Sequence, residues 1–377
     1  MILSDVCEFI VDCPHSTAPD EGKGYPLIRT PNVGKGRLDL NGVHRVSESV
    51  YKQRIQRGAP RANDLIFARE APAGNVALVQ ENQTVCLGQR TVLIRPNVQK
   101  VNPQYLVYYL LSPKPQYELL GTANGATVAH VNLPAIRNLK IELPEKSVQD
   151  KIGTILVTYD DLIENNQKQI KLLEEAVQRL YKEWFVNLRF PGHENTKIVD
   201  GVPEGWHRGT IGQIAEFKRG RTITKAQVKG GNVPVIAGGL EPAYYHNVAN
   251  TKAPVITISA SGANAGFVRL YGVDVFASDC SFVDGLGTES LFFVYEFLKE
   301  SKVSIDQLQK GSAQPHVYAK DINAMKITIP EKEYLERFDR YAKVYFNKIK
   351  TLQGQNERLK TARDLLLAKL MSGDVEV

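Results

Sequence analysis

The sequence predicts an α+β fold in which two similar strand-rich modules alternate with two long helices that pair as an antiparallel coiled coil. The first observation behind this prediction is an internal repeat: residues 125–145 (GATVAHVNLPAIRNLKIELPE) return without a gap as residues 311–331 (GSAQPHVYAKDINAMKITIPE), 186 positions later. The second is the helical spacing of apolar residues after each copy, and the third is a set of short strand-like runs before each copy. Together they predict two halves built on one plan and related by a pseudo-two-fold axis.

Each module is predicted to hold short strands bounded by glycine, proline and asparagine. The strand candidates are residues 64–68, 91–95, 255–259 and 274–277, and short helices are expected at residues 103–111 and 291–299. The modules diverge in sequence, yet residues 2–9 resemble residues 210–217, and residues 64–75 resemble residues 253–264 in pattern. The expected architecture is an irregular sheet with long loops in each half.

A long amphipathic helix is predicted after each copy of the repeat. From Val148 to Trp184, apolar residues recur three and four positions apart with one four-residue stutter, which is the spacing of a coiled-coil seam. Neither helix has a partner in its own segment, so we expect the two to pair, with asparagines at polar positions that fix the register. The predicted seam residues are Leu162, Asn166, Ile170, Leu173, Ile349, Leu352, Asn356 and Leu359. The alternative is that each helix packs only against its own module.

The chain of 377 residues is about the length of two ordinary domains. We expect four segments: a first module at 1–144, a central helix at 145–190, a second module at 191–330 and a C-terminal helix at 331–377. Proline and glycine directly after Phe190 indicate a break in the chain at the end of the central helix.

The composition excludes some classes of protein and favours none. The net charge of +6 is spread over the chain, so charge alone does not indicate a polyanion partner. No run of eighteen apolar residues and no secretion signal is present, and the four cysteines form no CxxC pair. We therefore expect a cytoplasmic protein with no membrane partner and no zinc cluster.

No catalytic motif emerges from the sequence. The nearest string to an amino-methyltransferase motif, Asp12-Cys13-Pro14-His15, has cysteine and histidine in place of proline and an aromatic residue. No Walker A string is present, and the acidic residues around Pro19 are too close together for a nuclease motif. His130 and His316 occupy matching repeat positions, but neither has ligand residues at metal spacing. We expect no catalytic residue and no metal site.

The central helix carries one set of distinctive strings: Leu143-Pro144, Gln149 and Asp161, and the run Leu180-Tyr-Lys-Glu-Trp-Phe-Val186 at its end. The modules carry a second set: Phe67-Ala-Arg-Glu-Ala-Pro72, Leu87-Gly-Gln-Arg90 and Asp200-Gly-Val-Pro-Glu-Gly-Trp206. In these strings, and over essentially its whole length, the chain resembles the specificity (S) subunit of Type I restriction–modification systems. The second module lacks the Arg-Glu-Ala-Pro and Gly-Gln-Arg strings of the first.

The resemblance implies that each module is a target recognition domain that reads half of a bipartite double-stranded DNA sequence. It also implies that the helices set the gap between the half-sites and dock two modification subunits, which bind S-adenosylmethionine and methylate adenine N6. Restriction subunits joining them would hydrolyse ATP with Mg²⁺ and cleave DNA. This chain would determine which DNA sequence the complex recognises, and it would hold no cofactor and catalyse no reaction.

Residues for reading DNA should be basic or amide and hydroxyl side chains on loops, because these reach base edges and phosphates. In the first module the candidates are Arg29, Lys35, Arg37, Arg69, Gln89, Arg90, Thr122 and Asn124. In the second they are Lys218, Arg219, Arg221, Ser259, Ser261, Asn264, Lys310 and Gln314. For each of them a solvated surface group or a turn former is the competing interpretation. For the whole chain, the alternatives are a coiled-coil scaffold that binds only proteins and a self-contained methyltransferase or nuclease.

Overall fold

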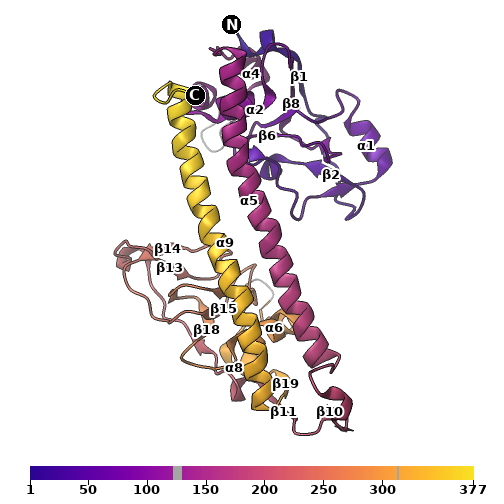
Figure 1. The fold of residues 1–377 in the computed structure, drawn as a ribbon, viewed down its shortest axis with the longest axis vertical. Coiled ribbons are helices and arrows are strands. Elements are labelled where there is room, and N and C mark those ends of the chain that lie inside the picture. Colours follow the sequence, from indigo (N-terminus) through magenta and orange to yellow (C-terminus); the bar gives the residue numbers. More distant parts are fainter. Residues whose placement is uncertain (122–129, 312–313) are drawn as a thin grey trace. The chain divides into compact units, whose positions relative to one another are not determined.

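A computed structural model describes residues 1–121, 130–311 and 314–377 (Figure 1). The chain forms two compact units: residues 1–165 with 355–377 make up unit 1, and residues 166–354 make up unit 2. Each unit therefore contains one module and parts of both long helices. The four-segment division predicted from the sequence stays a prediction, because these units divide the chain inside the helices.

Unit 1 is built on a five-stranded sheet and a smaller three-stranded one. The larger sheet has the order β1 (Cys7–Asp12), β8 (Thr91–Pro96), β5 (Leu65–Ala68), β6 (Val76–Leu78) and β3 (Gly36–Arg37). The smaller has the order β4 (Arg45–Val46), β2 (Tyr25–Ile28) and β7 (Cys86–Leu87). β5 is buried along its whole length and pairs antiparallel with both β8 and β6. Continuous burial explains its unbroken apolar run, Leu-Ile-Phe-Ala.

Four short helices complete the first module. They are α1 (Glu48–Arg54), α2 (Pro103–Leu111), α3 (Pro113–Gly121) and α4 (Leu133–Arg137). α2 begins where the sequence predicts, because Asn102 caps it: its Oδ1 accepts a hydrogen bond from the Tyr105 amide at 3.0 Å, and proline occupies the first helical position. The buried face of α2 packs with Leu65, Phe67 and Ile152 in one core.

Unit 2 repeats this strand order. Its four-stranded sheet runs β12 (Lys218–Arg219), β18 (Cys280–Asp284), β15 (Val255–Ser259) and β16 (Val268–Tyr271), and its three-stranded sheet runs β14 (Tyr244–His246), β13 (Val233–Ile236) and β17 (Phe276–Ala277). Two-stranded ladders join β11 (His207–Thr210) to β19 (Lys326–Ile329) and β9 (Ile198–Val199) to β10 (Val202–Pro203). The helices of the module are α6 (Leu291–Glu300), α7 (Lys302–Gln307) and α8 (Ala319–Asn323).

The predicted internal repeat is confirmed by the elements themselves. α4 and α8 begin 186 positions apart, as do the long helices α5 (Lys146–Tyr181) and α9 (Lys332–Ser372). The strand order is shared even where the sequences diverge, because the fold depends on the placement of buried strands and tolerates changes in the loops. Unit 1 adds β3 at its sheet edge, and a single bridge, Ile2 to Lys140, stands where unit 2 has the β11–β19 ladder.

The two long helices run antiparallel within each unit, as predicted (Figure 1). In unit 1 the Arg363 guanidinium of α9 pairs with Asp160 of α5, and Asn356, one to two turns earlier on α9, donates to the carbonyl of Ile163 at 3.4 Å. In unit 2 Trp184, just past α5, contacts the Phe338 ring of α9 edge-on, with 6.2 Å between the centroids. The helices also share apolar cores with their modules, so helix pairing and packing on a module coexist.

Most predicted seam residues lie where the two helices are buried. Asn166, Ile349, Leu352 and Asn356 are at most 8% exposed, and Ile170, Leu173 and Leu359 are half-buried. Leu162 is a correction: it is 46% exposed, and Ile163 is buried at 7% instead. Asp160 and Ile163, three residues apart on one face of α5, are both buried, and Tyr108 of the module donates to Asp160 at 2.6 Å. Within the described residues, no helix is both long and apolar enough to cross a membrane.

Candidate nucleic-acid interface

One end of each large sheet collects the loops that carry most of the predicted DNA-binding residues. In unit 1, β1 and β5 end and β8 begins at this end, because β8 runs antiparallel to both. The chain also returns there at His130, where the Val131 amide donates to the Arg69 carbonyl at 3.0 Å. Loops at strand ends held by a rigid sheet are the usual place for recognition residues. We call this end the loop end of the module.

Five side chains form a relay of hydrogen bonds and ion pairs at the loop end of unit 1. Arg69 donates through Nη1 to Asp12 Oδ2 at 2.6 Å and through Nε to the Val131 carbonyl at 2.8 Å. Its Nη2 lies 2.7 Å from Nε2 of His130, whose Nδ1 contacts Glu70. Glu70 in turn pairs with Nε of Arg90 at 2.9 Å. The relay therefore starts at a half-buried aspartate and ends at an arginine that is 61% exposed.

The two contacts of the His130 ring together require one tautomer. A guanidinium is a donor only, so Nε2 of His130 must accept from Arg69, which leaves the proton on Nδ1 to be donated to Glu70. Arg69, with its side chain only 11% exposed, thereby ties the segment at His130 to the end of β5. Arg69 is predicted from the sequence as a DNA contact, but the geometry gives it a positioning role.

Unit 2 builds a different cluster on the equivalent positions. The Gly220 amide donates to the Cys280 carbonyl as the Cys13 amide does to Thr91, so Arg219 corresponds to Asp12 and Asp279 to Arg90. Arg219 pairs with Asp279, and the Ser261 hydroxyl donates to the same carboxylate. The His316 amide and carbonyl both pair with Lys310. The end of the first strand of the large sheet thus holds an anion in unit 1 and a cation in unit 2, and the position before β8 or β18 holds the reverse.

The other candidates of unit 1 have mixed placements. Gln89 is at the loop end, and its Nε2 donates to the His15 carbonyl at 2.9 Å. Arg29 lies beside Gly88, with a buried Nε that lacks a partner among the described residues. Arg37 is away from this end, because it pairs with Asp161 of α5. Lys35 is exposed near α9. Thr122 and Asn124 lie outside the described residues.

The other candidates of unit 2 gather at its loop end. Ser259 is 4% exposed and donates to the Gly238 carbonyl at 3.1 Å, and Asn264 reaches the same carbonyl at 3.4 Å, so both organise loops. Lys310 pairs with Asp321 at 2.8 Å. Lys218, Arg221 and Gln314 are exposed. The prediction that these residues contact DNA remains a prediction.

Sequence reasoning missed further cations beside these residues. Lys225 and Lys229 are exposed on the loop after β12 and have no ion pair within the described part of the chain. The signal was present, because residues 218–229 hold five basic residues and no acidic one. The equivalent loop of unit 1 holds Asp20 and Glu21 instead, and both carboxylates accept backbone hydrogen bonds. The two loop ends therefore differ in charge as well as in sequence.

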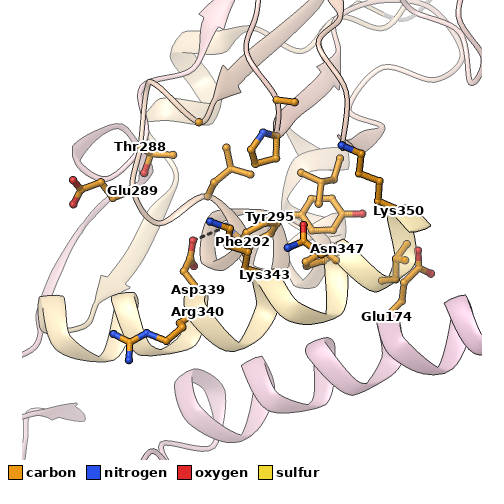
Figure 2. Close-up of a pocket in the computed structure, with 18 of the residues that line it drawn as sticks. Glu174, Thr288, Glu289, Phe292, Tyr295, Asp339, Arg340, Lys343, Asn347 and Lys350 are labelled. Atoms are coloured by element: carbon orange, nitrogen blue, oxygen red, sulfur yellow. Dashed lines mark hydrogen bonds between the residues drawn. The ribbon is translucent and has the colours of Figure 1, made fainter. Parts of the chain in front are cut away.

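A cavity of about 710 Å³ lies elsewhere, in unit 2 between α6 and α9 (Figure 2). At its wall Asp339 accepts hydrogen bonds from the Phe292 and Phe293 amides at 3.1 and 2.9 Å, so it caps α6 (Figure 2). Burial raises the pKa of Asp339 to about 7, against the lowering effect of those two bonds. One turn into α6, burial also raises the pKa of Glu296 to about 7, and neither of its carboxylate oxygens has a partner among the described residues.

Beyond these clusters, two kinds of chemical group bear on reactivity: metal ligands and activated thiols. Residues 1–121, 130–311 and 314–377 contain no group of three or more His, Cys, Asp or Glu side chains arranged to hold a metal ion. All four cysteines are free thiols, and burial raises the pKa of Cys7, Cys86 and Cys280 to about 12. A thiol with so high a pKa is a poor nucleophile.

Comparison with known proteins matches this arrangement to one family. The model of the Type I restriction modification DNA specificity domain matches residues 1–175 and again residues 203–361. Two relatives from Methanocaldococcus jannaschii are similar over most of their length. The Type I restriction enzyme MjaIX specificity subunit is 26% identical over 89% of this chain and 83% of its own. The putative MjaX specificity subunit is 25% identical over 100% and 93%.

A solved structure supports the fold. The S subunit of a Type I restriction-modification system from M. genitalium superposes with a TM-score of 0.60 at 17% identity, covering 98% of this chain and 95% of that one. Two modules with one strand order, joined by paired long helices, define the class of two-module specificity proteins. The chain belongs to the family of Type I restriction modification DNA specificity domains.

Membership in this family confirms the resemblance found in the sequence. The chain is a specificity subunit of a Type I restriction–modification system and a non-catalytic component of it. Such subunits work in complexes with the other subunits of the system. The predicted alternative of a self-contained enzyme is therefore wrong.

Proposed function

We propose that each module reads one half of a bipartite double-stranded DNA sequence with its loop end. The observation that carries this proposal is the repeat itself: one sheet framework appears twice, while the side chains at its loop end differ in kind and charge. A shared framework with different loops suits two readers of unlike half-sites, because the sheet positions the loops and the loops contact the bases.

The charges at the loop ends fit this task. In the second module Lys218, Arg221, Lys225 and Lys229 are exposed and can neutralise phosphates, which fix the register without reading sequence. In the first module Gln89 and Arg90 present an amide and a guanidinium, groups that bind the edges of adenine and guanine in the major groove. The modest net charge of +6 leaves room for partner subunits to supply further phosphate contacts.

We further propose that the long helices set the unspecified gap between the half-sites and dock two modification subunits. Those subunits would hold S-adenosylmethionine and methylate adenine, and restriction subunits would bring the ATP-dependent step. The chain itself would contribute the choice of sequence, in the cytoplasm where the chromosome lies. Exposed apolar residues on the helices, Leu172 and Val344 at 64% and 67%, offer surface for such contacts.

Methylation mapping by long-read sequencing tests the proposal. The full chain is co-expressed with its modification subunit, and we expect methyl-adenine at one split motif only when this chain is present. Replacing the first module by that of a relative, with both helices kept, should change one half of the motif and leave the other intact. Loss of both halves in a complex that still assembles would contradict modular reading. Co-purification of the subunits without any new methylation would favour the protein-only scaffold.

A binding measurement across salt concentration separates the same alternatives. Specific DNA binding through phosphates should weaken steeply as salt rises, with a linear dependence of log affinity on log salt concentration. A scaffold that binds only proteins would show no such dependence with a DNA probe.

A further inference from the structure

One exposed arginine at each loop end is held by a carboxylate. In unit 1 it is Arg90, directly before β8, paired with Glu70 at 2.9 Å. In unit 2 it is Arg219, at the end of β12, paired with Asp279. The two side chains are 61% and 48% exposed, whereas the carboxylates are 15% and 34% exposed. In both modules the carboxylate lies deeper than the cation, so the guanidinium is directed outward from a fixed base.

From this geometry we infer that Arg90 and Arg219 each read a guanine in the half-site of their own module. The inference rests on the proposed function and assigns it to two residues. A guanidinium offers a planar fork of donors that matches the O6 and N7 acceptors of guanine, and this is the commonest specific contact of proteins with DNA. Nε of Arg90 faces Glu70, and both of its Nη groups lack a partner within the described residues.

The backbone at Arg90 supports a dedicated role. Its φ is +65°, a left-handed conformation that costs a residue with a side chain about 1 kcal/mol or more. The conformation is maintained by its neighbours: the Arg90 carbonyl accepts from the Arg69 amide at 2.9 Å, and its side chain ends the relay from Asp12. Strained backbone of this kind is concentrated at functional sites.

The carboxylate partner favours base reading over phosphate binding. A negative group within 3 Å of the guanidinium repels a phosphate, which carries a full charge, more than it repels the neutral edge of a base. The carboxylate also limits the rotamers of a long side chain, so less entropy is lost when the fork meets its base. Free surface lysines such as Lys225 and Lys229 are better suited to phosphates.

The charges at two equivalent positions are reversed between the modules. Arg90 directly precedes β8 as Asp279 precedes β18, and Arg219 ends β12 as Asp12 ends β1. Both guanidinium groups therefore lie at the loop end of their module, but Arg90 lies beside β8 and Arg219 beside β12, which is equivalent to β1. We expect the guanine to stand at different positions within the two half-sites.

The test uses the full chain with its modification subunit and maps methylated motifs for Arg90→Ala and Arg219→Ala. Each variant should lose its preference at one G·C pair of one half-site, by about ten- to hundredfold, while the other half-site stays strict. Arg90→Lys keeps the charge but not the fork, and it should relax the same pair. Arg61→Ala is the matched control for unit 1, because Arg61 is also 61% exposed and paired with a glutamate but precedes β5 at the opposite end of the sheet. Arg208→Ala on β11 serves for unit 2.

The outcomes separate the inference from the proposed function. If the unchanged protein yields no split motif, the proposed function fails. If it yields a split motif that Arg90→Ala and Arg219→Ala leave strict, only the inference fails. It fails equally if Arg90→Lys keeps the motif strict while Arg90→Ala lowers affinity for every sequence and reduces the salt slope by about one, because that is the signature of a phosphate contact. Relaxation at an A·T pair would also overturn it.

Discussion

Glu296 of α6 is predicted to destabilise unit 2, and its removal should make the protein more stable. The side chain is 1% exposed, and both carboxylate oxygens lack a partner within the part of the chain that the structure describes. Burial raises its pKa from 4.5 to about 7, with Glu174 and Glu300 adding to the rise and Lys299 opposing it. The equivalent residue of α2 is Tyr108, which finds Asp160 as a partner, whereas the position equivalent to Asp160 in unit 2 is Phe346.

The magnitude follows from the difference between the folded and unfolded pKa values. A carboxyl group whose folded pKa is raised binds its proton more tightly in the folded state, so stability is lost as pH rises from about 4.5 through about 7. At pH 8 the full difference applies, which amounts to about 3 kcal/mol, and at pH 5.5 it amounts to about 1.5 kcal/mol. Glu296→Gln keeps the shape and removes the charge, so it should recover most of this energy.

Tryptophan fluorescence during urea denaturation reports the unfolding of unit 2, which contains Glu296. The chain has two tryptophans, and both Trp184 and Trp206 are buried in the core of unit 2. We expect Glu296→Gln to raise the unfolding free energy more at pH 8 than at pH 5.5. Asp339 also has a raised pKa, but it is present in both proteins, so its effect cancels in the difference. Glu289→Gln, at an exposed residue of unit 2 paired with Lys332, is the control. An unchanged or lowered stability at pH 8 would refute the reasoning.

Three further pairs of substitutions test the packing. Ile163→Asp should destabilise unit 1 by about 3 kcal/mol or more, because it buries a charge, whereas Leu162→Asp should change thermal melting little. Equal effects would support the sequence-based prediction that Leu162 is a seam residue. Arg69→Ala should cost about 3 kcal/mol in thermal unfolding, because it leaves Asp12 without its buried partner. A loss no larger than that of Arg61→Ala would argue against the relay. Asp339→Ala should cost about 1–2 kcal/mol by uncapping α6, measured by tryptophan fluorescence against Glu336→Ala, and equal values would remove its capping role.

The sequence predicted the parts of the fold that depend on periodicity. The regular spacing of apolar residues predicted both long helices, because helix periodicity is a local signal. The ungapped repeat of that pattern predicted their antiparallel pairing. The strand candidates at 64–68 and 91–95 were right to within a residue or two, because strand patterns are local signals as well. The one-residue error at Leu162 falls where α5 packs against a residue of the module: Tyr108, more than fifty positions earlier, donates to Asp160 on the buried face.

The polar clusters could not be predicted, because their members are far apart in the sequence. Asp12 and Arg69 are separated by 57 positions, and Arg69 and His130 by 61. Residue type alone made Arg69 and Ser259 as eligible for DNA contact as Arg90, and only burial separates them. The identity of a recognition residue depends on which neighbours satisfy its polar groups, and that is a property of the fold.

The two modules contact the long helices through different side chains, and this difference affects how the modules can be exchanged. In unit 1, Tyr108 donates to Asp160, which also pairs with Arg363, and Gly153 lets the start of α2 approach α5 closely. In unit 2 the positions 186 residues on from Gly153 and Asp160 hold Asp339 and Phe346. A second module placed on the helices of unit 1 would set Glu296 beside Asp160 and lose its cap on α6. We therefore expect exchange of one first module for another to disturb the helix contacts less than transfer of a second module to the first position.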